Sequence, residues 1–259
     1  MENVIYAEAF AAAWVVGMAV MMEVGRRVGT RRLARDPAKG MAGLGMIESA
    51  VFALLGLMIA FTFSGASSRF DTRRMLLAEE VNDIGTAYLR LDLLPAGAQP
   101  ALRALFRDYV SARLAAYAKW SDADAAKAEL ARCEALQTEI WTRAVAATGD
   151  PGAHVDATRL LLPALNTMID ITTTRTMAAR IHPPAVVYGI LFILGLGCAL
   201  LAGYGMAENT TRSWAHILGF IVLVGAAVFV ILDLEYPRIG FIRLDAYDQL
   251  LVDLLQQMK

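Results

Sequence analysis

The sequence of 259 residues has little of what catalytic, metal-binding and nucleic-acid-binding sites are usually built from. One of its two cysteines, Cys133, lies in a polar segment and the other, Cys198, in an apolar one, so an intrachain disulfide is not expected. The three histidines, His154, His182 and His216, show no zinc-like spacing with cysteines or acids. With 24 basic and 25 acidic residues, the chain lacks the positive excess that nucleic-acid binding requires. We expect no metal site, no cofactor and no nucleic-acid partner.

Charged residues are missing from four long stretches: Asn3–Met22, Ser49–Ser68, Pro183–Ala207 and Ser213–Leu232. Each stretch holds 20 to 25 residues, and Glu8 is the single charged residue among them. A hydrocarbon core about 30 Å thick is crossed by roughly 20 helical residues, so every stretch is long enough to span a bilayer. This pattern argues against a soluble enzyme, a disulfide scaffold and a disordered tail. We expect an all-α polytopic membrane protein with four transmembrane helices, and the lipid bilayer as a partner.

The charged residues gather between the second and third predicted spans. This segment carries 14 basic and 14 acidic residues, and its apolar residues recur at spacings of three and four, which is typical of helices. The sequence therefore predicts a helical extramembrane domain at residues 69–181. Transmembrane helices 1 and 2 lie before it in residues 1–68, joined by a basic loop at 23–47. Transmembrane helices 3 and 4 follow in residues 182–234. Residues 235–259 form an amphipathic C-terminal helix, which we expect to pack against the extramembrane domain.

Local signals predict where some helices begin and how far they run. Ser121–Asp124 has the composition of a helix N-cap. Residues Val155–Ile181 are expected to be helical despite an internal proline. The stretch Ser49–Leu94 contains no proline, so a single helix about 70 Å long is expected to leave the membrane, with Gly65 and Gly85 as its expected bends.

Basic residues in short loops favour the cytoplasmic side of a membrane. The first loop holds six of them and the third loop holds Arg212, whereas the basic residues on the opposite side are spread over more chain and mixed with acids. We therefore expect the loops in the cytoplasm, and both termini and the extramembrane domain on the outer side of the cell (inner) membrane. The six basic residues of the first loop are Arg26, Arg27, Arg31, Arg32, Arg35 and Lys39.

The second predicted span has an informative face. Its small residues Gly56, Ala60, Ser64 and Ser68 fall four apart, which places them in one ridge of a helix. Such ridges let membrane helices approach closely. Bulky residues beside the ridge are compatible with a pore wall that has a hydrophobic constriction. Ordinary helix packing explains the same spacing, and both interpretations stay open.

A catalytic site is not predicted. Glu79, Glu80 and Asp83 follow the second span, and paired acids can carry out acid–base chemistry. No nucleophile, oxyanion-binding group or histidine accompanies them. On a helix, Glu79 stacks on Asp83 and Arg69 on Arg73, and such like-charged pairs favour partners on other helices.

The stretch Leu54–Arg90 has Phe61 near the end of a span and then Arg69-Phe70-Asp71. This outline resembles the bestrophin-like bacterial membrane proteins and, more distantly, the bestrophin anion channels. Glu80–Arg90 and Leu232–Ile242 resemble the bacterial family closely. The likeness to the bacterial family covers most of the chain, whereas the likeness to true bestrophins covers a short part of it.

The resemblance implies a homo-oligomeric channel for small inorganic ions, five-fold in bestrophins, whose second helix lines a pore with an aromatic and aliphatic neck. It makes Phe52, Ile59, Thr62 and Phe63 candidates for this neck and places Arg69 near the pore mouth. It also implies selectivity for anions. Gly56, Ala60, Ser64 and Ser68 remain candidates for helix packing.

The chain departs from true bestrophins in three respects. Phe70-Asp71 stands where bestrophins have tandem tryptophans, their acidic calcium clasp has no counterpart, and their polar domain is cytoplasmic. The alternative hypothesis is a non-conducting sensor or scaffold that couples the extramembrane domain to a partner. An enzyme and a secondary transporter fit less well, because neither a nucleophile–base pair nor an inverted repeat is found.

Overall fold

The computed structural model describes residues 2–35, 44–119, 122–208, 212–237 and 240–258, and every regular element in them is a helix. The all-helical fold class is therefore confirmed. Lys39, Arg238 and the middle of the predicted basic loop lie outside the described residues.

The chain divides into two compact units. The apolar unit combines Glu2–Ser68 with His182–Tyr236, and the polar unit combines Arg69–Ile181 with Pro237–Lys259. The apolar unit contains α1 (Glu2–Arg35), α6 (Ala185–Gly205), the short η3 (Met206–Glu208), α7 (Trp214–Glu235) and the first part of α2 (Leu44–Leu89). The polar unit contains the rest of α2, η2 (Arg90–Leu93), α3 (Gln99–Ala118), α4 (Ala123–Thr148), α5 (Ala157–Arg180) and α8 (Asp245–Gln257).

Three helical stretches of the described residues are long and apolar enough to cross a membrane. They lie within Gly45–Leu93, Ala157–Glu208 and Trp214–Glu235, and so contain the second, third and fourth predicted spans. The first predicted span, Asn3–Met22, is part of α1, and its role as a fourth span stays a prediction.

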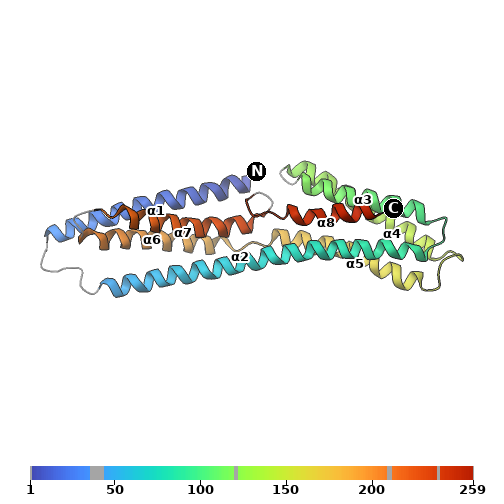
Figure 1. Ribbon diagram of the computed structural model, residues 1–259, viewed down its shortest axis with the longest axis horizontal. Coiled ribbons are helices and arrows are strands. Elements are labelled where there is room, and N and C mark those ends of the chain that lie inside the picture. Colours follow the sequence, from blue (N-terminus) through green and yellow to red (C-terminus); the bar gives the residue numbers. More distant parts are fainter. Residues whose placement is uncertain (1, 36–43, 120–121, 209–211, 238–239, 259) are drawn as a thin grey trace. The chain divides into compact units, whose positions relative to one another are not determined.

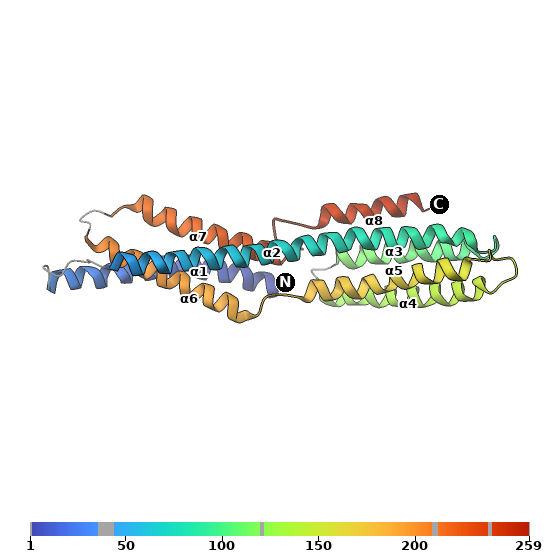
Figure 2. The same ribbon diagram turned by 90° about the horizontal axis from the view of Figure 1, so that it is seen from below.

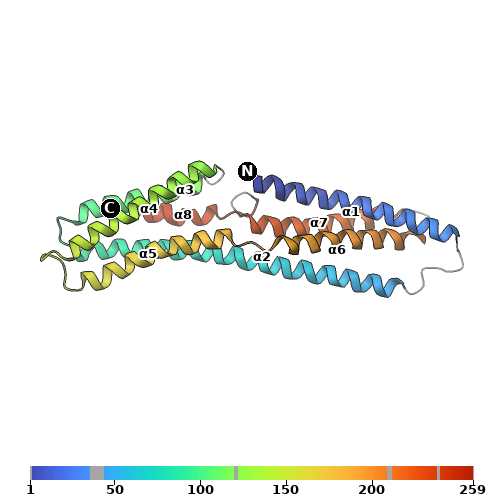
Figure 3. The ribbon, with the colours of Figure 1, turned by 180° about the vertical axis from the view of Figure 1, so that it is seen from behind.

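Close packing between α1 and α6 organises the apolar unit (Figure 3). A side-chain carbon at Gly25 would collide with the backbone of Leu200, and one at Gly203 would collide with the backbone of Met22. The two helices therefore approach so closely that only hydrogen fits at these positions, as in other membrane helix pairs with small residues at the contact. Trp14 is fully buried beside them and faces Gly195, which has no room for a side chain either.

The polar unit is a bundle of α3, α4, α5 and part of α2 (Figure 2). Phe106, Tyr109 and Leu165 are fully buried in its core. The amphipathic α8 adds Leu251 and Met258 to the same core, which confirms its expected packing against this part of the chain.

Helix boundaries in the polar unit follow local chemistry. Asp122 caps α4 as expected, because its side chain accepts a hydrogen bond from the Ala125 amide over 3.1 Å. The helix α5 contains Pro163 inside its second turn and runs on regardless, as expected for this segment. Pro163 has no amide hydrogen, so the helix lacks the bond from this position to the carbonyl four residues earlier, yet it continues to Arg180.

The helix α2 is the long cyan helix of Figure 1 and supplies residues to both units. Its 46 residues correspond to about 70 Å of helix. The helix passes both Gly65 and Gly85 without interruption, and the tighter turn of η2 follows it directly.

Candidate functional site

One side of α2 packs against its own chain in the apolar unit. Leu55 is buried in the core of this unit. Phe52 is half-buried and meets Phe220 of α7 edge to face, with ring centroids 5.7 Å apart. Ile59 is also half-buried against this core. Two of the four predicted neck residues, Phe52 and Ile59, therefore contact helices of the same protomer.

Thr62 uses its hydroxyl within α2. Its Oγ1 donates toward the carbonyls of Met58 and Ile59, over 2.8 and 3.0 Å, and the residue is half-buried. A threonine in a membrane helix commonly satisfies its hydroxyl in this way. The contact leaves an oxygen lone pair but no free hydroxyl proton.

The other side of α2 is exposed in the described protomer. Gly56, Ala60, Ser64 and Ser68 are all exposed, and Phe63 beside them is 44% exposed. A side-chain carbon added at Gly56 would meet nothing within 4 Å. We call these five residues the open face of α2.

Burial separates α2 from the other apolar helices. In the most apolar part of α2 only 6% of the residues are buried, whereas 33% are buried in the corresponding part of α7. Part of the exposed surface is bulky and suited to lipid, because Leu54, Leu57 and Phe61 are each at least half exposed. The small residues of the open face suit close contact with another helix, and Leu57 is turned only about 20° from Ser64 on the same side.

Beyond the apolar stretch, exposed residues of α2 continue at helical spacing. They occur every three or four residues in the polar unit. We call this set the exposed strip of α2: Thr72, Met75, Glu79, Asn82, Thr86 and Leu89.

The arginines of α2 are held in the protomer. Arg73 is buried, and its guanidinium donates to the Ala178 and Ile181 carbonyls over 3.1 and 3.0 Å. These carbonyls lie at the C-terminal end of α5, where free acceptors and the helix dipole favour a cation. Arg69, the predicted pore-mouth residue, is half-buried.

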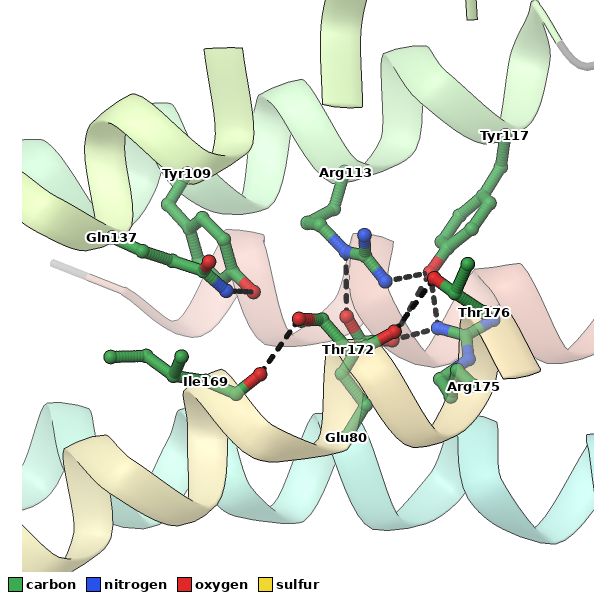
Figure 4. A network of polar contacts seen from close by, with 9 residues as sticks. All are labelled: Glu80, Tyr109, Arg113, Tyr117, Gln137, Ile169, Thr172, Arg175 and Thr176. Atoms are coloured by element: carbon green, nitrogen blue, oxygen red, sulfur yellow. Dashed lines mark hydrogen bonds and ion pairs between the residues drawn. The ribbon is translucent and has the colours of Figure 1, made fainter. Parts of the chain in front are cut away.

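A buried ionic network ties α2 to α3 and α5 (Figure 4). The Arg113 Nε donates to Glu80 Oε1 over 2.6 Å, and Arg175 pairs with Oε2 of the same carboxylate. The Tyr117 hydroxyl lies between the two guanidinium groups and also contacts Glu80 Oε2 over 3.2 Å. The side chain of Glu80 is fully buried and that of Arg113 is 4% exposed.

The sequence pointed to Glu80 only as one of several acids and missed Arg113, Tyr117 and Arg175 altogether. Their common signal is helical: Arg113 and Tyr117 lie four apart on α3, so both face α2 together. The polar groups of the network bond to one another, which is typical of a structural role rather than a catalytic one.

Two further groups in the polar unit are perturbed by burial. Burial raises the pKa of the Tyr109 hydroxyl, which also accepts a hydrogen bond from Gln137 Nε2 over 3.1 Å. Burial likewise raises the pKa of the Cys133 thiol, although nearby Arg113 opposes the shift. A thiol with a raised pKa is a poor nucleophile at neutral pH.

The start of the third predicted span carries a histidine–carboxylate contact. His182 Nδ1 lies 3.1 Å from Glu235 Oε1, and its ring stacks on Tyr236 with centroids 5.1 Å apart. Glu235 is buried. Within the described ranges, no group of three or more histidine, cysteine or acidic side chains is arranged to hold a metal ion.

The family model of the Bestrophin-like domain matches residues 11–246. The chain belongs to the bestrophin-like family. This match confirms the resemblance drawn from the sequence, and it covers all but the first ten and the last thirteen residues of the chain. No curated protein and no solved structure matches it. Family membership together with three long apolar helices makes it a membrane protein of the bestrophin-like class.

Proposed function

We propose that this bestrophin-like protein is a homo-oligomeric ion channel of the cell membrane, in which the α2 helices of several copies surround a central pore. The observation that carries the proposal is the open face of α2. Four apolar helices with almost no charge inside the membrane enclose no polar pathway alone, whereas several copies can enclose one between them. We further propose that α1 is the fourth span and that the polar unit lies on the outer side.

The open face also selects among the neck candidates. Phe63 is exposed on the open face, whereas Phe52 and Ile59 are held by their own protomer. We assign Phe63 as the neck residue, with Gly56 and Ala60 as close neighbours across the axis. Phe52 and Ile59 then fix the rotation of α2 by packing against their own protomer, Thr62 keeps its hydroxyl bonded within α2, and Arg69 directly follows the span at the pore mouth.

Single-channel recording from purified protein in planar bilayers tests the proposal. Phe63→Ala should raise conductance several-fold, because a smaller side chain widens a hydrophobic constriction. Phe61→Ala is the matched control: Phe61 is exposed too, but it points about 160° away from Phe63 on the same helix.

A bilayer that stays sealed across voltage, pH and calcium concentration would contradict conduction. Equal effects of Phe61→Ala and Phe63→Ala would contradict the assignment of the neck.

A second candidate function is a non-conducting sensor or scaffold. It is favoured by the uninterrupted course of α2, which takes part in both units and is suited to transmit a change between them. Co-purification of a stoichiometric partner from the native membrane, without conductance, would support this function over the channel.

A further inference from the structure

One side of the helix α1 carries exposed apolar residues. Residues four apart share one side of a helix. Four valines at this spacing are each at least 40% exposed: Val16, Val20, Val24 and Val28. On the other side of α1, Gly25 and Gly29 pack closely on α6 and η3. The exposed valines therefore suit contact with the acyl chains of lipid, which are equally apolar.

Three arginines continue this side of α1 beyond the valines. Arg27, Arg31 and Arg35 also fall four apart, and all three are exposed. We call them the arginine ridge. Arg31 is turned only about 20° from Val24 around the helix and lies about 10 Å further along it. The side of α1 that suits lipid chains is thus the side that presents guanidinium groups where the apolar stretch ends.

Aromatic residues mark the same end of the apolar unit. The Arg32 Nη1 donates to the hydroxyl of Tyr204, near the end of α6, over 2.6 Å. The Arg212 guanidinium lies over the ring of Trp214, where α7 begins, 5.5 Å from its centroid. Tyrosine and tryptophan gather where the hydrocarbon core gives way to lipid headgroups. Arg31 precedes Arg32 directly, so the arginine ridge lies at this level.

The charge of the arginine ridge is only partly compensated. Arg27 pairs with Glu23 of the preceding turn over 2.8 Å. Among the described residues, Arg31 and Arg35 form no ion pair, and Asp36, which follows them, lies outside those residues. Like charges four apart on a helix repel one another. An anion bound between the two guanidinium groups would remove this repulsion.

We propose that Arg31 and Arg35 bind the phosphate group of an anionic phospholipid whose acyl chains lie against the exposed valines of α1. The two residues are about 6 Å apart along the helix, so both side chains can reach one headgroup. Each guanidinium can donate two parallel hydrogen bonds to phosphate oxygens. The inference needs α1 to face the bilayer, as proposed above, and depends neither on conduction nor on which side of the membrane the loops occupy.

Native mass spectrometry of the purified full-length protein tests the proposal. The protein is titrated in detergent with phosphatidylglycerol, which is anionic, or with phosphatidylcholine of the same acyl chains, which has no net charge. The wild type should bind its first phosphatidylglycerol about tenfold more tightly than its first phosphatidylcholine. Replacing both arginines, by Arg31→Gln and Arg35→Gln together, should remove most of this preference.

The matched control combines Arg132→Gln with Arg143→Gln. It removes two exposed arginines of α4 and so changes the net charge of the chain by the same amount. It should leave the preference for phosphatidylglycerol unchanged. Arg31 and Arg35 are exposed, so their replacement leaves no buried group without a partner, and circular dichroism checks that both double variants are folded.

Three results would contradict the lipid site. They are equal affinity of the wild type for the two lipids, a preference that survives the loss of both ridge arginines, and a preference that the α4 control loses as well. Displacement of the bound lipid by millimolar glycerol phosphate, which has no acyl chains, would assign the arginines to soluble phosphates and overturn the role of the valines.

Conductance is measured separately and keeps the two proposals apart. A channel that conducts without any preference for phosphatidylglycerol overturns this inference alone. A protein that prefers phosphatidylglycerol but leaves a bilayer sealed overturns the channel alone.

Discussion

At the scale of single residues, the polar unit depends most on Glu80. One fully buried carboxylate faces two guanidinium groups, from Arg113, which is buried, and from Arg175, which is 11% exposed. Burying charges is costly, and the cost is offset only while every partner is present. The network therefore fixes which faces of α2, α3 and α5 meet.

Glu80→Gln should lower the free energy of unfolding by about 3–5 kcal/mol, because it leaves the buried Arg113 and the half-buried Arg175 without a countercharge. Thermal unfolding of the full-length protein in detergent, followed by circular dichroism, measures the loss. Asp92→Asn is the control, because the Asp92–Arg103 pair is largely exposed at the carboxylate and is worth less than about 1 kcal/mol. A shift for Glu80→Gln no larger than that of the control would contradict the role of the network.

Cys133 should resist alkylation in the folded protein at pH 7.5. Cys133 is 3% exposed, so a reagent reaches its thiol poorly. Burial also raises the pKa of the thiol, so little of the reactive thiolate form is present. Maleimide labelling of a Cys198→Ser background, followed by mass spectrometry, measures this. In the same background, Ala131→Cys on the exposed side of α4 should label rapidly. Fast labelling of Cys133 without denaturant would contradict the buried position.

The raised pKa of Cys133 also has a consequence at alkaline pH. The ordinary value is 9.0, and the folded state holds the proton to higher pH than the unfolded chain does. The unfolded chain therefore loses the proton first as pH rises past 9.0, which lowers the stability of the fold. The fall in melting temperature between pH 8 and pH 10 should be smaller in Cys133→Ala, which has no thiol to titrate.

At the scale of elements, the sequence predicted helices well and their neighbours poorly. The cap at Asp122, the helix α5 and the unbroken α2 follow from local spacing and turn chemistry. The like-charged pairs on α2 indicated partners on other helices, and Arg73 has them on α5, 105 residues away. No local signal encodes such a distance.

The glycines also show that a local sequence pattern does not identify the helix that packs against it. The small-residue ridge of α2 was the conspicuous pattern, yet the closest helix contact within the protomer joins α1 and α6. A ridge of small residues permits close approach but does not name the partner, because helix association in lipid depends on the fit of two surfaces. The candidate neck divided for this reason: the resemblance grouped Phe52 with Phe63, and packing within the protomer separates them.

Gly203→Ala should destabilise the protein, although alanine favours helices by about 1 kcal/mol over glycine. The added methyl would collide with the backbone of Met22 and force α1 and α6 apart. Gly197→Ala on the same helix meets nothing within 4 Å and should be neutral or stabilising. Melting temperature and the yield of monodisperse protein measure the difference. Similar behaviour of the two variants would contradict the close contact of α1 with α6.

At the scale of the whole molecule, the protein is proposed to work as an assembly of identical chains. The chain mass of 28.1 kDa makes the count directly measurable by native mass spectrometry. A closed ring fits a face that one protomer leaves uncovered, because cyclic symmetry buries the same surface on every copy.

Gly56→Leu should shift the mass from a multiple of 28.1 kDa toward the single chain, because a large side chain holds neighbouring α2 helices apart. Gly189→Leu is the control: Gly189 on α6 is also exposed with nothing within 4 Å, yet it lies off α2. It should leave the assembly intact. A wild type that is a single chain in lipid nanodiscs would contradict the shared axis.

The place of α8 in the polar core bears on how the protein is made. Leu251 and Met258 complete a core whose other residues come from Ile84–Met168. The ribosome synthesises α6 and α7 before it reaches Leu251 and Met258. The apolar surface of α2, α3, α4 and α5 that these two residues cover therefore stays exposed while α6 and α7 enter the bilayer. During that interval the nascent chain offers a binding site for chaperones, and removal of residues 245–258 should prolong it indefinitely.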